Sequence, residues 1–155
     1  MASARLCAQL TVTTISISED YDVTPAELWA ELRHIERHVQ WMHDAVAITF
    51  ESDQREGVGT SFVCTTKVGP FVTKDLMTIT EWADNSLMGV EHRGLVRGVG
   101  VFRILKSSKG STLTWSETLH FPWWMGGAFG ALAASPILRA LWRKNLRTLR
   151  RVASH

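Results

Sequence analysis

The chain has 155 residues, of which 45% are hydrophobic and 21% are charged, and its formal net charge is +2 at neutral pH. This length predicts one domain that buries about two-thirds of its surface, which excludes a need for disulfides or a structural metal. Acidic residues are confined to the first 117 positions, whereas six of the 17 basic residues follow them, so the basic C-terminal segment is the first candidate for a partner surface.

Targeting signals are weak throughout the chain. Residues 1–9 lack the pattern of a signal peptide, and we expect them to form a disordered N-terminus before a single domain at 10–152. The longest apolar run, residues 121–138, is interrupted by glycines and Pro136, which argues against a membrane span. Cys7 and Cys64 indicate free thiols in a reducing compartment, with a single disulfide as the alternative. We therefore expect a cytoplasmic protein without stable membrane insertion.

The first elements in chain order are a strand and a helix. Residues 10–19 are rich in Thr, Ile and Val, which favours a strand. Thr24, Pro25 and Glu27 then form the pattern of a capping box, with Pro in the first turn of a helix. A second short helix is expected over residues 36–41.

Six further strands are predicted between residues 46 and 121. Their expected ranges are 46–51, 60–68, 71–82, 86–93, 99–106 and 111–121. The short connections contain the Gly, Pro, Asn and Asp residues that hairpin turns require. This order predicts an antiparallel meander with one packed face.

A long C-terminal helix is predicted over residues 136–152, with Ser135 as its cap and Pro136 at its first position. Its apolar side is expected to cover the sheet. That side consists of Leu138, Leu141, Trp142, Leu146, Leu149 and Val152, with Asn145 near its centre. The fold class is therefore α+β, a curved seven-stranded antiparallel sheet wrapped around a long helix. A concave space between them suits a small-molecule ligand.

Glu117 is the most unusual residue of the predicted strand 111–121. It shares parity with Leu113, Trp115 and Leu119, so a carboxylate falls on the apolar side of the strand. A bare buried carboxylate costs several kcal/mol. A bulge could turn it outward, a cation could pair with it, or the sheet edge could be solvated. Alternatively, Glu117 projects into a ligand cavity, where it binds a ligand hydroxyl or acts as a general acid or base.

Three further polar patterns allow both a structural and a functional interpretation. His92 shares parity with apolar neighbours, so it is either a core histidine or a cavity group. Glu19 poses the same question as Glu117 near a strand end. Asn145 interrupts the apolar side of the helix as Glu117 interrupts that of the strand. We therefore expect these two to face one cavity, where Asn145 could donate a hydrogen bond to the carboxylate.

Metal, cofactor and nucleic-acid motifs are weak. His34, His38 and His43 could hold a metal, but their charged surroundings favour a polar helix face. The sequence contains no Walker loop, Gly-x-Ser-x-Gly or Cys-x-x-Cys motif, so no cofactor and no metal are expected. The basic side of the last helix could bind nucleic acid or anionic lipid, but a solvated surface is the simpler interpretation. No aromatic residues alternate with these charges, so no nucleic-acid partner is expected.

Together these elements resemble the helix-grip (SRPBCC) superfamily, which includes START lipid-transfer domains, birch-pollen-allergen-like proteins and polyketide cyclase/dehydrase-like proteins. The resemblance covers residues 10–152. It rests on the helix start at 23–29, Trp41, the strand edges at 57–60, 80–82 and 110–115, and Pro122 with Asn145-Leu146. It adds Trp41 to the candidate ligand-binding residues. The full candidate set is Trp41, Met77, Ile79, His92, Phe102, Trp115, Glu117, Trp142 and Asn145.

The function expected from these patterns is binding of a small hydrophobic molecule, aromatic, polyketide-like or lipid-like, by a monomer or homodimer. The first alternative is an enzyme of the polyketide cyclase/dehydratase kind without a cofactor, with Glu117 and His92 as candidate catalytic residues. The second alternative is a regulatory interaction protein that uses the basic side of the C-terminal helix. Fold alone does not decide among them.

Overall fold

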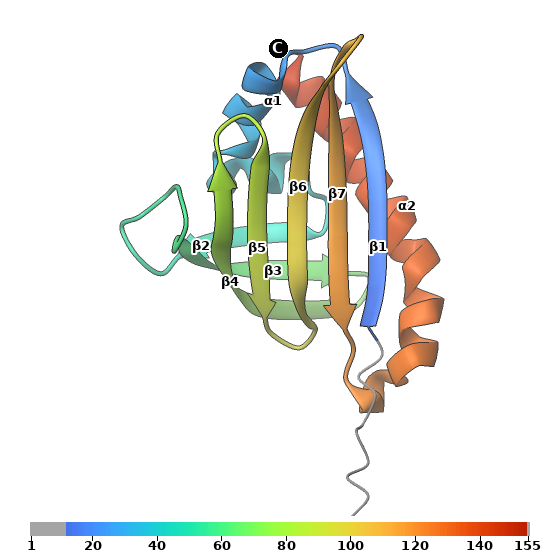
Figure 1. Ribbon diagram of the computed structural model, residues 1–155. Coiled ribbons are helices and arrows are strands. Elements are labelled where there is room, and N and C mark those ends of the chain that lie inside the picture. Colours follow the sequence, from blue (N-terminus) through green and yellow to red (C-terminus); the bar gives the residue numbers. More distant parts are fainter. Residues whose placement is uncertain (1–11, 155) are drawn as a thin grey trace, which may run out of the picture.

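The computed structural model describes residues 12–154 (Figure 1). Within these residues seven strands form one antiparallel sheet in the order β1-β7-β6-β5-β4-β3-β2. The strands are β1 (Val12–Tyr21), β2 (Ala45–Phe50), β3 (Ser61–Val68), β4 (Phe71–Ala83), β5 (Leu87–Arg93), β6 (Arg97–Ser107) and β7 (Gly110–His120). Two short helices, α1 (Pro25–Leu32) and the 3-10 helix η1 (Ile35–Gln40), connect β1 to β2. A 3-10 turn, η2 (Trp123–Met125), leads from β7 into the long helix α2 (Gly127–Ala153).

The predicted α+β fold with a seven-stranded antiparallel sheet and a long C-terminal helix is confirmed. Each strand from β2 to β7 lies within two residues of its predicted range. The capping box of α1 is present, because Thr24 Oγ1 accepts a hydrogen bond from the Glu27 amide and the Glu27 carboxylate accepts one from the Thr24 amide. The expected N-terminus at 1–9, the start of the first strand and Cys7 lie outside the described residues.

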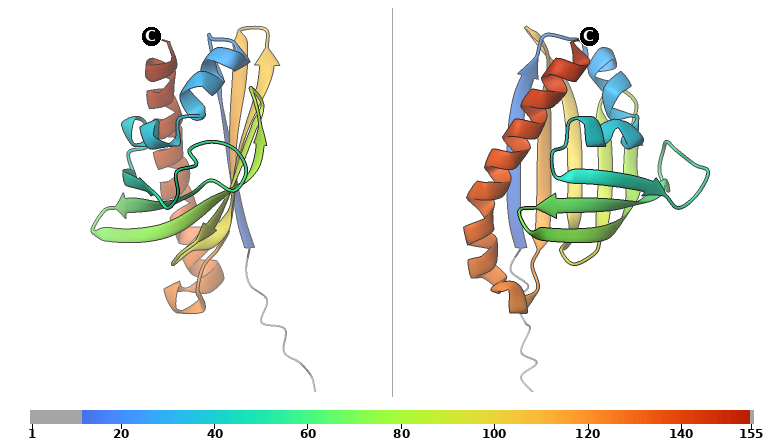
Figure 2. Two further views of the ribbon diagram at one scale, coloured as in Figure 1. Left: turned by 90° about the vertical axis from the view of Figure 1, so that its left-hand side faces the viewer. Right: turned by 180° about the vertical axis from the view of Figure 1, so that it is seen from behind.

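Curvature of the sheet creates a concave side. Figure 2 shows β2 and β3 bending across the sheet on the same side as α2. Helix α2 packs mainly along β1, at one edge of the sheet, while η1 packs against β2 at the other. The concave side is therefore bounded by the sheet, by η1 and by α2.

The apolar side of α2 enters the core as the sequence predicts. Trp142, Leu146 and Leu149 are buried with the inward residues of the sheet. Tyr21 on β1 donates a hydrogen bond of 2.9 Å to the carbonyl of Leu146. Burial of these large side chains is worth about 1.5–3 kcal/mol each, so this contact is a main source of stability for the domain.

The predicted start of the last helix is wrong. Helix α2 begins at Gly127, nine residues before Pro136, and Pro136 lies inside it. Ser135 is not a cap, because its hydroxyl donates to the carbonyl of Ala131 within the helix. Proline leaves the carbonyl four residues earlier without its helical donor. That residue, Leu132, is strongly exposed, so water can reach the free carbonyl.

The basic side of α2 is only partly solvated. Arg143 and Arg147 are exposed, but Arg139 is half-buried and donates to the carbonyl of Ser16. Arg150 pairs with the Glu19 carboxylate, which answers the question raised by that acid on β1. Part of the basic side therefore anchors the helix to the edge strand.

Cys64 forms no disulfide within the described residues and is buried. Between residues 12 and 154, no helix is long and apolar enough to cross a bilayer.

Candidate functional site: a cavity between sheet and helix

A cavity of about 530 Å³ lies between the concave side of the sheet, η1 and α2. Apolar side chains supply most of its wall, among them Met77, Ile79, Phe102, Trp115 and Trp142. The indoles of Trp115 and Trp142 stack with their centroids 4.8 Å apart, which joins the sheet wall to the helix wall. Packed protein cores leave few voids larger than a water molecule, so a space of this size is a candidate binding site.

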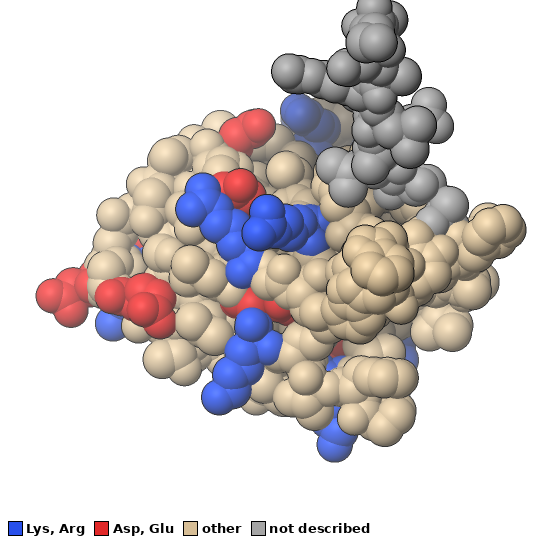
Figure 3. Space-filling model, turned by 90° about the horizontal axis from the view of Figure 1, so that it is seen from below, with Lys and Arg blue, Asp and Glu red and all other residues tan. Residues whose placement is uncertain are grey.

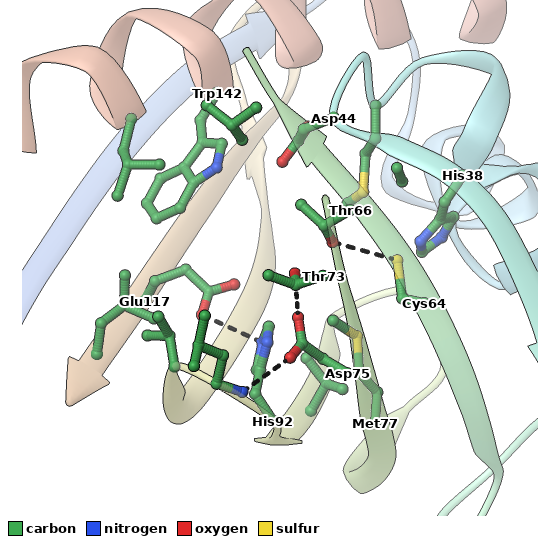
Figure 4. A pocket seen from close by; sticks show the side chains of 18 of the residues that line it. His38, Asp44, Cys64, Thr66, Thr73, Asp75, Met77, His92, Glu117 and Trp142 are labelled. Atoms are coloured by element: carbon green, nitrogen blue, oxygen red, sulfur yellow. Dashed lines mark hydrogen bonds and ion pairs between the residues drawn. The ribbon is translucent and has the colours of Figure 1, made fainter. Parts of the chain in front are cut away.

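Glu117 points into this cavity from β7 (Figure 4). Burial alternates strictly along β7, so Glu117, which is 3% exposed, shares the inward side with Leu113, Trp115 and Leu119. Its Oε1 accepts a hydrogen bond of 2.8 Å from the indole N–H of Trp115. No bulge turns the carboxylate outward, since β7 keeps its register with both described neighbours through this point.

His92, the neighbour of Glu117 in the cavity, comes from β5. Its Nε2 lies 3.3 Å from Glu117 Oε2, within ion-pair distance. The two atoms do not meet at hydrogen-bond angles, and each lacks a hydrogen-bond partner among the described residues. Burial lowers the pKa of His92, but the interaction with the Glu117 carboxylate outweighs burial, so the pKa of His92 lies above its ordinary value. The pair thus holds one acceptor and one donor that make no hydrogen bond within the described residues.

Gly100 on β6 makes room for the Glu117 carboxylate. The two residues are register partners across β6 and β7. A Cβ atom at position 100 would lie 2.4 Å from Glu117 Oε1, far inside van der Waals contact. A side chain at 100 would therefore force the carboxylate out of its present position.

The predicted contact between Asn145 and Glu117 is wrong. Asn145 is fully buried and does not line the cavity. Its Oδ1 accepts from the amide of His43 at 2.9 Å, and its Nδ2 donates to Asp44 Oδ1 at 2.7 Å. Since α2 packs beside β1 and the loop before β2, the middle of its apolar side meets that loop. Asn145 ties the loop to the helix.

Asp44, which the sequence analysis missed, lines the cavity across from Glu117 (Figure 4). Burial raises its pKa, the hydrogen bond from Asn145 opposes this, and the charge of Glu117 adds to the rise. The charge of Glu117 therefore acts on Asp44 across the cavity. Asp44 lies in a loop, where the sequence has no periodic pattern, so the sequence did not indicate that its side chain faces the cavity.

Asp75 on β4 is a third cavity carboxylate that the sequence analysis missed. Its oxygens accept hydrogen bonds from the Leu95 amide at 3.1 Å and from the Thr73 hydroxyl at 2.9 Å. A signal was present, because Thr73 and Asp75 share parity with Met77 and Ile79, two residues that were expected to face inward.

Seven of the nine candidate residues line the cavity, and two do not. The seven are Met77, Ile79, His92, Phe102, Trp115, Glu117 and Trp142. Trp41 is buried behind the wall, with its ring centroid 5.0 Å from that of His38 and 6.1 Å from that of Phe102. It supports the lining without contacting the cavity, as Asn145 does elsewhere.

The three histidines near η1 do not form a cluster. His38 Nε2 lies 2.8 Å from the Leu32 carbonyl, and burial lowers its pKa to about 4. His43 bonds to the Thr148 hydroxyl, and His34 lies beside Glu36. No group of His, Cys, Asp and Glu side chains among the described residues could hold a metal ion.

One end of the cavity opens to solvent between exposed apolar side chains. The lining residues that are also strongly exposed are Phe71, Val72, Leu95 and Ile137. They place the mouth between the β3–β4 turn, the β5–β6 turn and α2. Trp123 and Phe129, which are 86% and 83% exposed, add to the apolar surface of η2 and α2. Figure 3 shows a broad uncharged area at this end of the molecule.

Comparison with solved structures identifies the fold. TTHA0849 from Thermus thermophilus aligns with a TM-score of 0.79 and 13% identity, over 91% of this chain and 97% of that chain. The di-domain ARO/CYC protein StfQ of the steffimycin biosynthetic pathway aligns with a TM-score of 0.77 and 11% identity, over 92% of this chain and 51% of that chain. Ara h 8.0201 aligns with a TM-score of 0.66 and 13% identity, over 92% and 98% of the two chains.

Two comparisons of the sequence found no match. No protein-family model matches the chain, and no curated protein matches it significantly. The similarity in structure shows that the chain has a helix-grip fold. The sequence identities of 11–13% are too low for the function of these proteins to be transferred to this chain.

Proposed function

We propose that this protein binds a small, largely apolar molecule in the cavity between the sheet and α2. The observation that carries the proposal is a space of about 530 Å³ with a mostly apolar wall and a few convergent polar groups. This combination is typical of small-molecule sites, where apolar contact supplies affinity and polar groups fix orientation. The apolar mouth supports the proposal, because it gives a hydrophobic ligand a path inward.

Two other observations bear on the choice of function. StfQ, an ARO/CYC protein of a biosynthetic pathway, has a similar fold, which is compatible with a ligand in this space. An interaction protein that works through the basic side of α2 needs no cavity, and two arginines of that side are bound to β1. The cavity therefore favours ligand binding over that alternative.

A cavity-blocking variant tests the proposal. Val68 lines the cavity, whereas Val46 is half-exposed and does not. Val68→Trp should lower the affinity for a hydrophobic probe such as Nile red by about tenfold or more, because overpacking removes the bound volume. The matched control Val46→Trp should bind as the parent does. Native mass spectrometry of gently purified protein should show a retained small molecule. Equal Nile red affinity in both variants would refute binding in this cavity.

A second candidate function, acid–base catalysis without a cofactor, is favoured by the pairing of Glu117 with His92. A carboxylate can remove a proton from carbon next to a carbonyl, while a protonated imidazole donates to the carbonyl oxygen or to a leaving hydroxyl, which departs as water. The raised pKa of His92 suits the donor role near neutrality. In this function the protein is a cyclase or dehydratase.

The second candidate is tested with 2-tetralone, a compact aromatic ketone. In deuterated water the protein should accelerate exchange of its α-hydrogens, measured by NMR, because the carboxylate removes the proton and solvent returns a deuteron. Glu117→Gln should abolish the acceleration and keep the probe bound. Exchange at the buffer rate with the parent protein would rule out this role for the pair.

A further inference from the structure

The charged groups of the cavity are almost entirely acidic. Among the described residues, its wall contains the carboxylates of Asp44, Asp75 and Glu117, and no Lys or Arg. The two imidazoles in the wall are the remaining groups that could carry positive charge. His38 is neutral at pH 7, since burial lowers its pKa to about 4. Within residues 12–154, His92, whose pKa lies above its ordinary value, is therefore the one group of the wall that can supply positive charge.

The positive charge of His92 is already matched. Its Nε2 lies 3.3 Å from Glu117 Oε2, so the imidazolium and the carboxylate neutralise each other within the wall. An anionic ligand would find no free cation in the described part of the wall and would face Asp44 and Asp75. Because the surroundings are mostly apolar and weakly screened, an unpaired ligand charge would be strongly disfavoured.

Hydrogen-bond acceptors, in contrast, remain available. Glu117 Oε2 has no hydrogen-bond partner in the part of the chain that the structure describes, although its Oε1 is bound by the Trp115 indole. Both oxygens of Asp75 already accept hydrogen bonds from Leu95 and Thr73. Glu117 Oε2 is therefore a carboxylate oxygen of the wall with unused acceptor capacity, which an O–H or N–H group of a ligand can satisfy once a small movement of the side chain exposes it.

We propose that the cavity selects hydrophobic ligands that are neutral or cationic and carry a hydrogen-bond donor, such as a phenol, an alcohol or an amine, and that it excludes carboxylates. The donor binds Glu117, while the rest of the ligand fills the apolar space beneath Trp115 and Trp142. This inference rests on the proposed function and specifies the ligand class of the same site.

Three probes with one ring system test the selection. 2-Naphthol, 2-(aminomethyl)naphthalene and 2-naphthoate differ in the charge and hydrogen-bonding of one substituent, and 2-methylnaphthalene supplies the apolar reference. Isothermal titration calorimetry at pH 7 should give naphthoate an affinity weaker than that of naphthol by about tenfold or more, which corresponds to about 1.4 kcal/mol. The amine should bind at least as tightly as naphthol.

A charge-neutralising variant tests whether Glu117 causes the selection among the probes. Glu117→Gln should weaken binding of the amine by about fivefold or more and bring the affinity for naphthoate to within about threefold of that for naphthol. The change removes one negative charge from the wall and leaves the His92 charge without its partner. Glu91→Gln is the matched control, since Glu91 lies on β5 outside the cavity and pairs with Arg93. It should leave all affinities within about twofold.

Two results would overturn the inference. Naphthoate binding as tightly as naphthol to the parent protein would refute the selection while leaving the proposed function intact. Failure of all four probes, including 2-methylnaphthalene, would refute both the selection and hydrophobic binding in the cavity. The comparison among probes uses the parent protein, so it stands even if Glu117→Gln does not fold.

Discussion

Replacing Asn145 with Asp tests the polar link between α2 and the loop before β2. Asn145 Nδ2 donates to Asp44 Oδ1 at 2.7 Å, and Asn145 is fully buried while Asp44 is half-buried. Asn145→Asp keeps the shape and the acceptor for the His43 amide, but it sets two carboxyl groups at hydrogen-bond distance. Two carboxylates so close cannot both be ionised, so one must hold a proton in the folded state.

The cost follows from the proton that the folded state must keep. An ordinary Asp has a pKa of about 3.9, so holding it protonated at pH 7 costs about 4 kcal/mol, and at pH 5 about 1.5 kcal/mol. The folded variant binds one more proton than the unfolded chain between these pH values. Its free energy of unfolding therefore falls as pH rises, and the loss relative to the parent shrinks as pH falls.

Urea unfolding followed by tryptophan fluorescence at pH 5, 6 and 7 measures this loss. Asn85→Asp is the matched control, because Asn85 lies in the exposed β4–β5 turn. It should change stability by less than about 0.5 kcal/mol at each pH. A loss in Asn145→Asp that does not vary with pH, or no loss at pH 7, would refute the proposed coupling of Asn145 to the Asp44 carboxylate.

Two further predictions concern α2. Leu146→Asp should unfold the domain, because Leu146 is fully buried and the change places an unpaired charge in the core. Circular dichroism should show that the control Leu132→Asp, on the exposed part of the helix, stays folded. A Leu146→Asp variant as stable as the parent would contradict the packing. Replacing Arg139, Arg143 and Arg147 with Gln should keep Nile red affinity within about threefold, since none of them lines the cavity, and a larger loss would assign the basic side a functional role.

The strands and the inward carboxylate were predictable because their signals are local. Alternation along residues 111–121 placed Glu117 on the buried side without knowledge of its neighbours. The same parity in β4 would have found Asp75 if it had been followed towards the start of that strand. Periodicity gives the direction of a side chain relative to its own strand or helix. This direction is sufficient to predict that a side chain is buried where one side of the element faces the core.

The remaining features depend on how elements meet. Asn145 was correctly placed on the apolar side of α2, but its hydrogen-bond partner depends on where the helix lies. Helix α2 lies along β1 and the loop before β2, so Asn145 contacts that loop. Asp44 belongs to that loop, where no repeat constrains direction. The start of α2 was missed because Pro136 resembles a first-turn proline, whereas the helix continues through it.

Gly100 and Glu117 constrain the order in which this site can change during evolution. A side chain at position 100 would occupy the space of the Glu117 carboxylate and displace it from its present position. The change at 100 therefore costs less once position 117 holds a smaller side chain than in the reverse order. Among homologues, residues larger than glycine at 100 should therefore be found mainly together with a residue smaller than Glu at 117.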